Sequence, residues 1–171
     1  MPDSPQPLVA ILTGSPNDVP KVAKAQEALD QLGVPSELRV LSAHRTPEMT
    51  VQYVRDAEAR GVRVFVACAG MANHLAGVVA AHTLRPVIGV PLASGALGGF
   101  DALLSTVQMP PGIPVATVAV DGARNAGLLA VRILAASDDA LRDAVVRFQA
   151  DLADSVVARD RALQEQLSSD A

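Results

Sequence analysis

Short apolar runs alternate with longer amphipathic segments along most of the chain. The runs are rich in valine, leucine and alanine and occupy residues 8–13, 37–41, 62–67, 86–90 and 115–120. Apolar residues recur at helical spacing between and after them, at residues 19–32, 47–60, 75–82, 100–107 and 125–134. Strands that alternate with helices are typical of an α/β protein whose parallel sheet is covered on both faces. We therefore predict a doubly wound, five-stranded parallel sheet in the flavodoxin-like strand order.

The last part of the chain is a long helical pattern, residues 138–167, in which charged and apolar positions are interspersed. Its apolar positions include Leu141, Val145, Phe148, Leu152 and Val156. A helix with such a stripe needs a partner surface. We therefore expect a flexible leader at residues 1–7, an α/β domain at residues 8–136, and a helical extension at residues 137–171 that packs on an oligomer.

Size, charge and aromatic content limit what the protein can be. A length of 171 residues suits one domain with a sizeable core. The net charge of −4, without a block of lysines and arginines, argues against a general nucleic-acid binder. Aromatic residues make up 2% of the chain, which disfavours base stacking. A positive mean hydropathy with a charged fraction of 19% favours surface buried between subunits.

Cysteine content and apolar run lengths bear on the compartment. The single Cys68 cannot form an internal disulfide, and zinc-like spacings of cysteine and histidine do not occur. The first seven residues contain three prolines rather than the apolar core of a signal peptide. Apolar runs are too short to cross a membrane. We therefore expect a cytoplasmic protein that binds neither a metal nor a membrane.

Residues 41–47 should form a loop at the carboxyl end of the second strand, the sheet edge where ligands bind. Within four positions this loop offers a hydroxyl, an imidazole and a guanidinium, from Ser42, His44 and Arg45. Serine and arginine suit a phosphate, which leaves His44 for proton transfer near neutral pH. Alternatively, Ser42 or Thr46 caps the next helix, Arg45 is solvated and His44 is an ordinary loop residue. The segment alone leaves both interpretations open.

A second polar loop, residues 14–18, follows the first strand. Gly14 permits a tight turn, and the helix start that follows offers backbone N–H groups to an anion. Ser15 can add a hydroxyl to a phosphate, while Asp18 can accept hydrogen bonds from ribose hydroxyls. Asp18 can equally be a plain N-cap. The loop lacks the glycine spacing and the lysine of a P-loop, so it carries little information by itself.

The third strand should deliver another loop to the same edge. Gly70 and the alanines around it would let a ligand approach the backbone closely. His74 either contacts the substrate or caps the helix that follows it. His82 is expected as a residue near a helix C-terminus, and Cys68 as a small buried core residue. The glycine-rich segment 91–99 is expected to be mobile or close to another backbone.

Four segments are more informative when they are taken together and in order. They are Gly14-Ser15-x-x-Asp18, Ser42-Ala43-His44-Arg45-Thr46-Pro47, Ala69-Gly70-x-x-x-His74-Leu75 and Ser105-Thr106-Val107-Gln108-Met109-Pro110. The set resembles the phosphoribosylaminoimidazole carboxylase catalytic subunit family of purine biosynthesis. The similarity continues through residues 86–91 and 114–119 to Asn125-Ala126, so it covers roughly residues 8–134.

The resemblance implies an enzyme that acts on a small ribonucleotide. The bacterial form of this family is an N5-carboxyaminoimidazole ribonucleotide mutase, an isomerase that needs neither a metal nor a cofactor. It is usually a homo-octamer with sites at subunit contacts, and functional coupling to the carboxyaminoimidazole ribonucleotide synthase is expected. By resemblance His44 is the acid and base. The substrate-binding set is expected to be Ser15, Asp18, Ser42, Arg45, Gly70 and His74.

The implied reaction moves a carboxylate from an exocyclic nitrogen to ring carbon C4, and it suits a single imidazole. The nitrogen must be protonated as CO₂ leaves, and the C4 proton must be removed after CO₂ adds. His44 can do both in sequence, because an imidazole both donates and accepts a proton near neutral pH. Between the two steps CO₂ must be kept from water, a task suited to the small residues at 70–72 and 95–99.

Several positions differ from the usual mutase. Asn17 and Val19 stand where family members commonly carry serine and tryptophan, and the loop at residues 121–124 is shorter. Asn73 stands where mutases tend to have alanine. The asparagine and the shorter loop resemble a sister class that carboxylates aminoimidazole ribonucleotide directly with CO₂.

Other positions favour the mutase. Arg45, His74 and the segment 107–110 resemble the mutases, whereas direct carboxylases often have lysine at the first of these positions. We therefore predict a mutase. The alternatives are a direct carboxylase and a non-catalytic nucleotide-binding module on the same fold, which would need the phosphate-binding groups but not His44.

Overall fold

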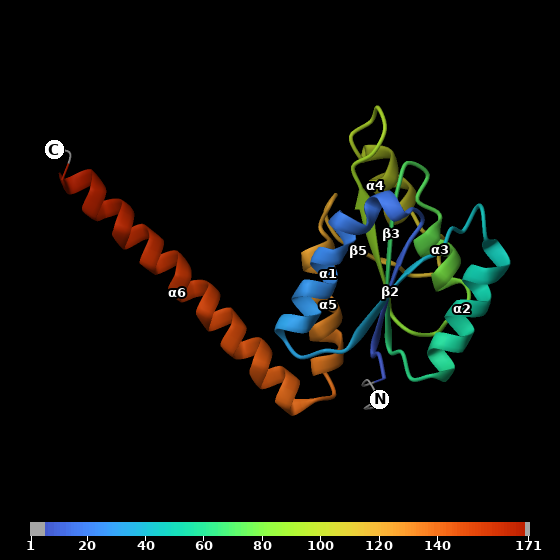
Figure 1. The fold of residues 1–171 in the computed structure, drawn as a ribbon, viewed down its shortest axis with the longest axis horizontal. Coiled ribbons are helices and arrows are strands. Elements are labelled where there is room, and N and C mark those ends of the chain that lie inside the picture. The colour runs from blue at the N-terminus through green and yellow to red at the C-terminus, as the bar shows by residue number, and fades with distance from the viewer. Residues whose placement is uncertain (1–5, 170–171) are drawn as a thin grey trace.

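The computed structural model describes residues 6–169 and contains one parallel sheet between two layers of helices (Figure 1). The strand order is β2-β1-β3-β4-β5, and all neighbouring pairs are parallel. The strands are β1 (Val9–Thr13), β2 (Ser36–Val40), β3 (Val64–Gly70), β4 (Val87–Leu92) and β5 (Ala116–Thr117). This is the flavodoxin-like order, so the predicted fold class is confirmed.

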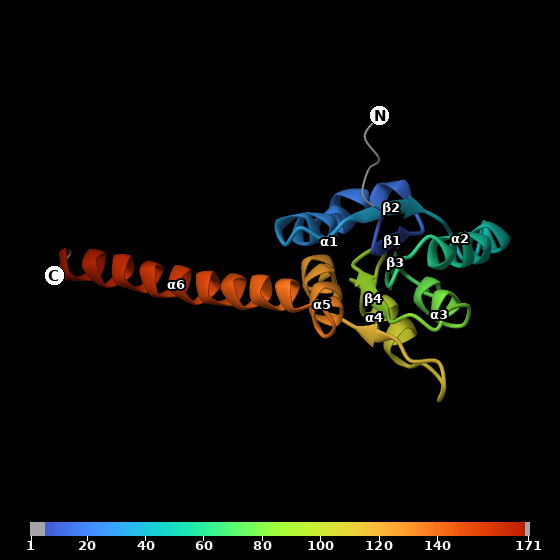
Figure 2. The same cartoon turned by 90° about the horizontal axis from the view of Figure 1, so that it is seen from below.

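Helices cover both faces of the sheet. They are the 3₁₀ turn η1 (Pro16–Asp18), α1 (Val19–Gln31), α2 (Pro47–Ala59), α3 (Leu75–Ala80), α4 (Phe100–Val107), α5 (Ala123–Ala135) and α6 (Asp139–Ser169). Figure 2 shows α1 and α5 on one side of the strands and α2 and α3 on the other. Each layer buries its own apolar cluster against the sheet, and β1 and β4 are buried throughout. Two-sided burial explains why the strands appear as continuous apolar runs.

The observed strand ends differ from the predicted ones at the edge where ligands would bind. β3 was expected to end at residue 67 and β4 at residue 90, yet Ala69 pairs with Pro91 and Gly70 pairs with Leu92. β3 and β4 are both longer than expected, because the backbone of each supplies the hydrogen-bond partners for the added residues of the other. Consequently Gly70 lies at the end of a strand rather than inside a loop.

β5 has two residues instead of the six expected, and Pro91 explains the difference. The carbonyl of Pro91 accepts the N–H of Asp121 at 2.9 Å, so this residue turns its backbone polar groups toward the β5 side. Proline has no N–H to donate there. The ladder therefore ends shortly after Val118 N–H binds the carbonyl of Gly89 at 3.1 Å.

The C-terminal helix projects away from the sheet (Figure 1). Its first turns pack against the α1 and α5 layer through Leu141 and Val145. Along the whole of Asp139–Ser169 the structure buries no residue fully. The exposed large apolar side chains of this helix are Val146, Leu152, Val156, Val157, Leu163 and Leu167. The helix is where the sequence predicts it, while its packing on an oligomer stays a prediction.

Two further expectations concern the leader and membranes. Residues 1–5 of the predicted leader lie outside the described residues. Within residues 6–169, every helix is too short or too polar to span a lipid bilayer.

Candidate active site

The loops that follow β1, β2 and β3 meet around one cavity of about 500 Å³ at the carboxyl edge of the sheet. Ligands of open α/β sheets bind at this edge. The lining includes every residue of the predicted catalytic and substrate-binding set, namely Ser15, Asp18, Ser42, His44, Arg45, Gly70 and His74. The juxtaposition follows from strand order, because β1 lies between β2 and β3.

Two imidazoles meet in this cavity. Nε2 of His44 lies 2.7 Å from Nδ1 of His74, and the rings are edge to face with centroids 4.8 Å apart. A hydrogen bond between two imidazole nitrogens needs a hydrogen on one and a lone pair on the other. One ring must therefore donate an N–H to the other, and both rings are exposed to the cavity. His74 occupies the N-cap position of α3, but within residues 6–169 its side chain caps no backbone group.

Arg45 ties the first and second loops together. Its guanidinium donates to the carbonyl of Gly14, and its Nε lies 3.4 Å from the hydroxyl of Ser42. The backbone N–H of Arg45 also donates to this hydroxyl, at 3.2 Å. Thr46 closes the loop through hydrogen bonds between its hydroxyl and the backbone of Ser42. The loop thus holds an exposed guanidinium beside the hydroxyl of Ser42 through hydrogen bonds.

Asp18 is the ionisable residue of the first loop. It occupies the N-cap position of α1, but in the described part of the chain its side chain makes no capping hydrogen bond. Ser15 has the capping role nearby, since its hydroxyl accepts the N–H of Asn17 at 3.3 Å. Burial raises the pKa of the Asp18 carboxyl, Lys21 lowers it, and Asp121 opposes Lys21. A carboxylate that lines a cavity and whose charged form is disfavoured by burial is a candidate for ligand binding.

Gly70 has a packing role that the sequence did not reveal. A Cβ at this position would overlap the hydroxyl of Ser94 and lie 2.9 Å from its Cβ. The missing side chain therefore admits Ser94, which also lines the cavity. Ser94 was not predicted, because the glycine-rich segment was expected to be either mobile or close to another backbone, and neither expectation singles out a side chain. The signal was a serine two residues after β4, at the same sheet edge as the other loops.

Asn73 points away from the cavity. The residue is 1% exposed, and its amide donates to the hydroxyl of Thr106 at 2.8 Å and to the carbonyl of Val90 at 3.4 Å. Its backbone N–H donates to the hydroxyl of Ser105 at 3.0 Å. The asparagine that departs from the usual mutase therefore joins the β3–α3 loop to α4.

Two other titratable residues lie where they were expected. Cys68 is fully buried in the core, and burial raises the pKa of its thiol. His82 lies just beyond α3, with Nδ1 at 2.8 Å from the carbonyl of Val78. It lines a larger cavity of about 920 Å³ at the amino edge of the sheet, where Arg85 and Glu58 pair at 3.1 Å. Catalytic groups are not expected at this edge of an open α/β sheet.

A metal site needs several ligating side chains close together. Within residues 6–169, histidine, cysteine, aspartate and glutamate side chains form no group of three that could hold an ion. The expectation of metal-free chemistry stays a prediction.

Comparison with known proteins identifies the family. The family model described as AIR carboxylase matches residues 8–155. The chain is 53% identical over 163 residues to an N5-carboxyaminoimidazole ribonucleotide mutase of Mycobacterium tuberculosis, covering 95% of this chain and 94% of the relative. A mutase of Pyrococcus horikoshii is 48% identical over 162 residues, covering 95% and 92%. The crystal structure of Treponema denticola PurE superposes with a TM-score of 0.84 at 32% identity, covering 92% of this chain and 98% of that one. The resemblance read from the four motifs is therefore confirmed, and the chain belongs to the AIR carboxylase (PurE) family.

Proposed function

We propose that this chain is an N5-carboxyaminoimidazole ribonucleotide mutase of purine biosynthesis. Sequence identity of 53% and 48% to two mutases, over nearly the full length of the chain, supports this function. The observation that carries it is the cavity in which His44 and His74 meet beside the loops of Ser15, Asp18 and Arg45. His44, the proposed acid and base, thus faces groups suited to a phosphorylated sugar.

The binding roles follow from the donors and acceptors on the cavity wall. Ser15, Ser42 and Arg45 bind the phosphate, and Asp18 accepts hydrogen bonds from ribose hydroxyls. A guanidinium has five N–H donors, so the bond from Arg45 to Gly14 leaves others for the ligand. These contacts are remote from the reacting atoms and fix the imidazole ring of the substrate relative to His44.

The chemistry needs one proton to leave His44 and one to return. His44 protonates N5 as the bond from N5 to the carboxylate carbon breaks and CO₂ forms. The electron pair of the amino-substituted ring then attacks CO₂ from C4, and His44 removes the C4 proton to restore the aromatic ring. Overall no proton is gained or lost. The contact with His74 supports one orientation of the His44 ring.

Small residues on the cavity wall suit the intermediate. Ala43, Ala69, Gly70 and Ala72 line the same space as His44. A wall of methyl groups and backbone accommodates CO₂ and gives water few partners, which limits its loss between the two steps.

We propose further that the protein is a homo-oligomer, and an octamer is the copy number that the family resemblance implies. Exposed apolar side chains support association. Besides those of α6, they include Met71, Leu97, Phe100, Leu104 and Val107, which gather on α4 and the loops beside the cavity. Isolated subunits rarely leave so much apolar surface in water.

The function is tested with purified protein and the N-carboxylated nucleotide at low bicarbonate, by following the 4-carboxylated product. We expect product to form without added bicarbonate. Activity only from the decarboxylated nucleotide plus bicarbonate would instead identify a direct carboxylase. Saturable binding without turnover of either nucleotide would indicate a binding module.

The role of His44 is tested by His44→Asn. Turnover should be abolished while nucleotide affinity stays within about tenfold, because the change removes proton transfer and leaves the phosphate contacts. His82→Asn is the matched control, since this histidine lies at the opposite edge of the sheet and should retain full activity. Normal rates in His44→Asn would exclude His44 as the acid and base.

A further inference from the structure

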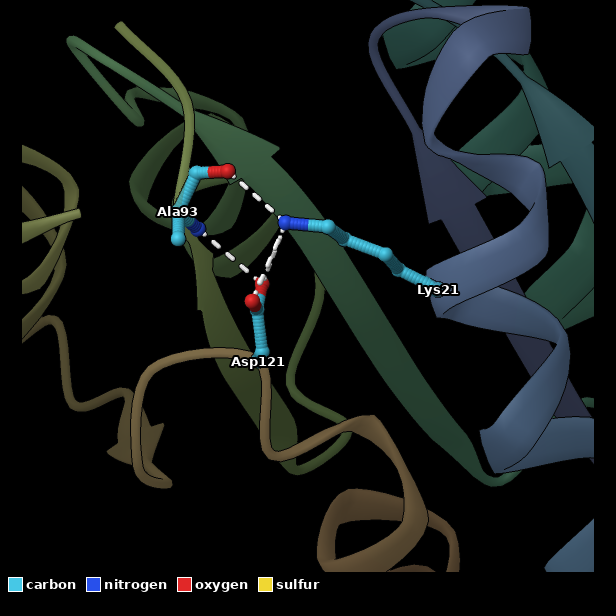
Figure 3. A network of polar contacts seen from close by, with 3 residues as sticks. All are labelled: Lys21, Ala93 and Asp121. Carbon is cyan, nitrogen blue, oxygen red and sulfur yellow. Dashed lines mark hydrogen bonds and ion pairs between the residues drawn. The ribbon is translucent and has the colours of Figure 1, made fainter. Parts of the chain in front are cut away.

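An ion-paired network beside the cavity joins three segments that are far apart in the sequence (Figure 3). Nζ of Lys21, on α1, lies 2.7 Å from the carbonyl of Ala93 and 3.1 and 3.0 Å from the two carboxylate oxygens of Asp121. The N–H of Ala93 donates to the same carboxylate at 3.0 Å. An ammonium group has three N–H donors, and here it has three oxygen acceptors.

The backbone of Asp121 indicates that this arrangement is held firmly. Asp121 has φ +55°, the left-handed region that few residues with a side chain adopt, although aspartate adopts it more readily than most. Its N–H donates to the carbonyl of Pro91 at 2.9 Å, while its carboxylate binds Ala93. Asp121 therefore holds the end of β4 through both its backbone and its side chain.

The held segment is the base of the glycine-rich loop, residues 93–99. The loop starts at Ala93 and returns to it, because a Cβ on Gly99 would lie 3.0 Å from Cα of Ala93 and 2.6 Å from the side chain of Val120. Residues 95–98 between these points are exposed. Ser94, next to the network, lines the cavity and fills the space left by Gly70.

The other end of the network lies close to Asp18. Lys21 follows Asp18 by three residues, which is about one helical turn. Lys21 lowers the pKa of the Asp18 carboxyl, and Asp121 raises it. The network therefore acts on two walls of the cavity at once, Ser94 on one loop and Asp18 on another.

We propose that Lys21 and Asp121 are positioning residues for the substrate. Their ion pair ties the base of the glycine-rich loop to α1, so that Ser94 and Asp18 are held at a fixed separation across the binding cavity. This inference rests on the proposed function for its substrate. The pair itself is 39% and 40% exposed, and ion pairs this exposed add little to stability. Its effect should therefore appear in ligand binding rather than in folding.

The test compares Lys21→Met, Asp121→Asn and the double variant, by KM and kcat for the N-carboxylated nucleotide. Each single change should raise KM about tenfold, with kcat within about twofold, because the chemistry at His44 is untouched. The double variant should be no worse than either single variant, since both remove the same link. Lys21→Arg keeps the charge and can pair with the carboxylate, so it should restore KM to within about threefold of the native value.

A readout that needs no substrate separates this inference from the proposed function. Hydrogen exchange of residues 93–99 should be faster in Lys21→Met and Asp121→Asn than in the native protein. Arg85→Met is the matched control, because it breaks an ion pair of similar exposure at the other edge of the sheet and should change neither KM nor this exchange. If the native protein showed no turnover but hydrogen exchange of residues 93–99 were faster in the two variants, the proposed function would be refuted. The role of the ion pair in holding the loop would still stand.

Three results would overturn the inference. The first is unchanged exchange of residues 93–99 in both single variants, which would mean that the pair does not hold the loop. The second is an unchanged KM in both. The third is additive effects of the two substitutions, which would assign them to separate causes.

Discussion

Asp18, Thr46 and His74 each stand at the start of a helix, at α1, α2 and α3. None of the three caps its helix with its side chain within the described residues. A side-chain cap typically contributes about 1 kcal/mol. Instead Thr46 closes the loop of Ser42, His74 contacts His44, and Asp18 lines the cavity. At the residue scale, Asp18 and His74 therefore line the cavity instead of capping a helix, and we expect them to serve ligand binding at the expense of local helix stability.

Asp18→Asn tests whether the carboxylate serves ligand binding at the expense of stability. Burial raises the pKa of the Asp18 carboxyl in the folded protein, so its ionised form costs stability at any pH above that pKa. The neutral amide removes the cost, so we expect a slightly higher Tm at neutral pH and a difference that shrinks as pH falls through the pKa of Asp18. KM should rise by about 10- to 100-fold, because a charged acceptor for the ribose hydroxyls is lost.

The measurements for Asp18 are thermal melting across pH and KM for the nucleotide. In the native protein 1/KM should fall with acidification at a higher pH than an ordinary aspartate would cause, and this dependence should be absent from the variant. Asp30→Asn is the control, an exposed acid on the same helix that should leave KM unchanged. A lower Tm for Asp18→Asn at neutral pH would show that the carboxylate serves the fold.

The sequence left two roles open for Asp18 and His74, and there is a physical reason. Caps and ligand contacts use the same residue types, because both need a short polar side chain beside backbone N–H groups. The choice depends on side-chain direction, which periodicity does not encode. His44 and Arg45 were easier to identify, because three kinds of polar group within four positions are unusual in a chain that is half hydrophobic.

At the scale of elements, the existence and order of the strands could be predicted, but their ends could not. Apolar runs reveal a strand because burial on both faces removes polar positions. A strand ends where its partner stops supplying hydrogen bonds, and that depends on another part of the chain. The pairing of Gly70 with Leu92 and the missing N–H of Pro91 therefore set the ends of β3, β4 and β5.

Asn73 illustrates how an element can be held by a residue that looks functional in the sequence. We expect Asn73→Ala to lower stability by about 1 kcal/mol through the lost bond to Thr106. For a chain of this size this corresponds to a Tm lower by about 2–4 °C. The choice between the N-carboxylated and the decarboxylated nucleotide should not change, because the side chain faces away from the cavity.

The partner residue supplies the control for Asn73. Thr106→Val removes the same hydrogen bond, so the double variant should lose less stability than the sum of the two single variants. Chemical denaturation and the ratio of rates on the two nucleotides give the two readouts. If Asn73→Ala moved the preference between the nucleotides, the asparagine would have a part in selecting the reaction.

At the scale of the whole molecule, the feature that the fold leaves unexplained is α6. Helical periodicity predicted the helix, but a sequence does not say what covers its apolar side. In the single chain, Leu141 and Val145 reach the core, while the more distal apolar residues are exposed. Burial of one such side chain is worth roughly 1.5–3 kcal/mol, so the uncovered stripe is a strong drive to associate.

Leu152→Glu combined with Val156→Glu tests whether α6 carries the assembly. These side chains are 48% and 61% exposed in the single chain, so the change should leave the fold of one subunit intact. Light scattering at micromolar concentration should give a multiple of the 17.6 kDa chain for the native protein, eightfold if it is an octamer, and a smaller mass for the variant. Gln149→Glu with Gln164→Glu adds the same charge at exposed polar positions of the helix and should keep the native mass. Because the added charges are matched, a smaller mass in both variants would point to charge repulsion. An unchanged mass in both variants would place the subunit contacts away from α6. A smaller mass in the Leu152→Glu, Val156→Glu variant alone would mean that burial of the apolar stripe holds the assembly together.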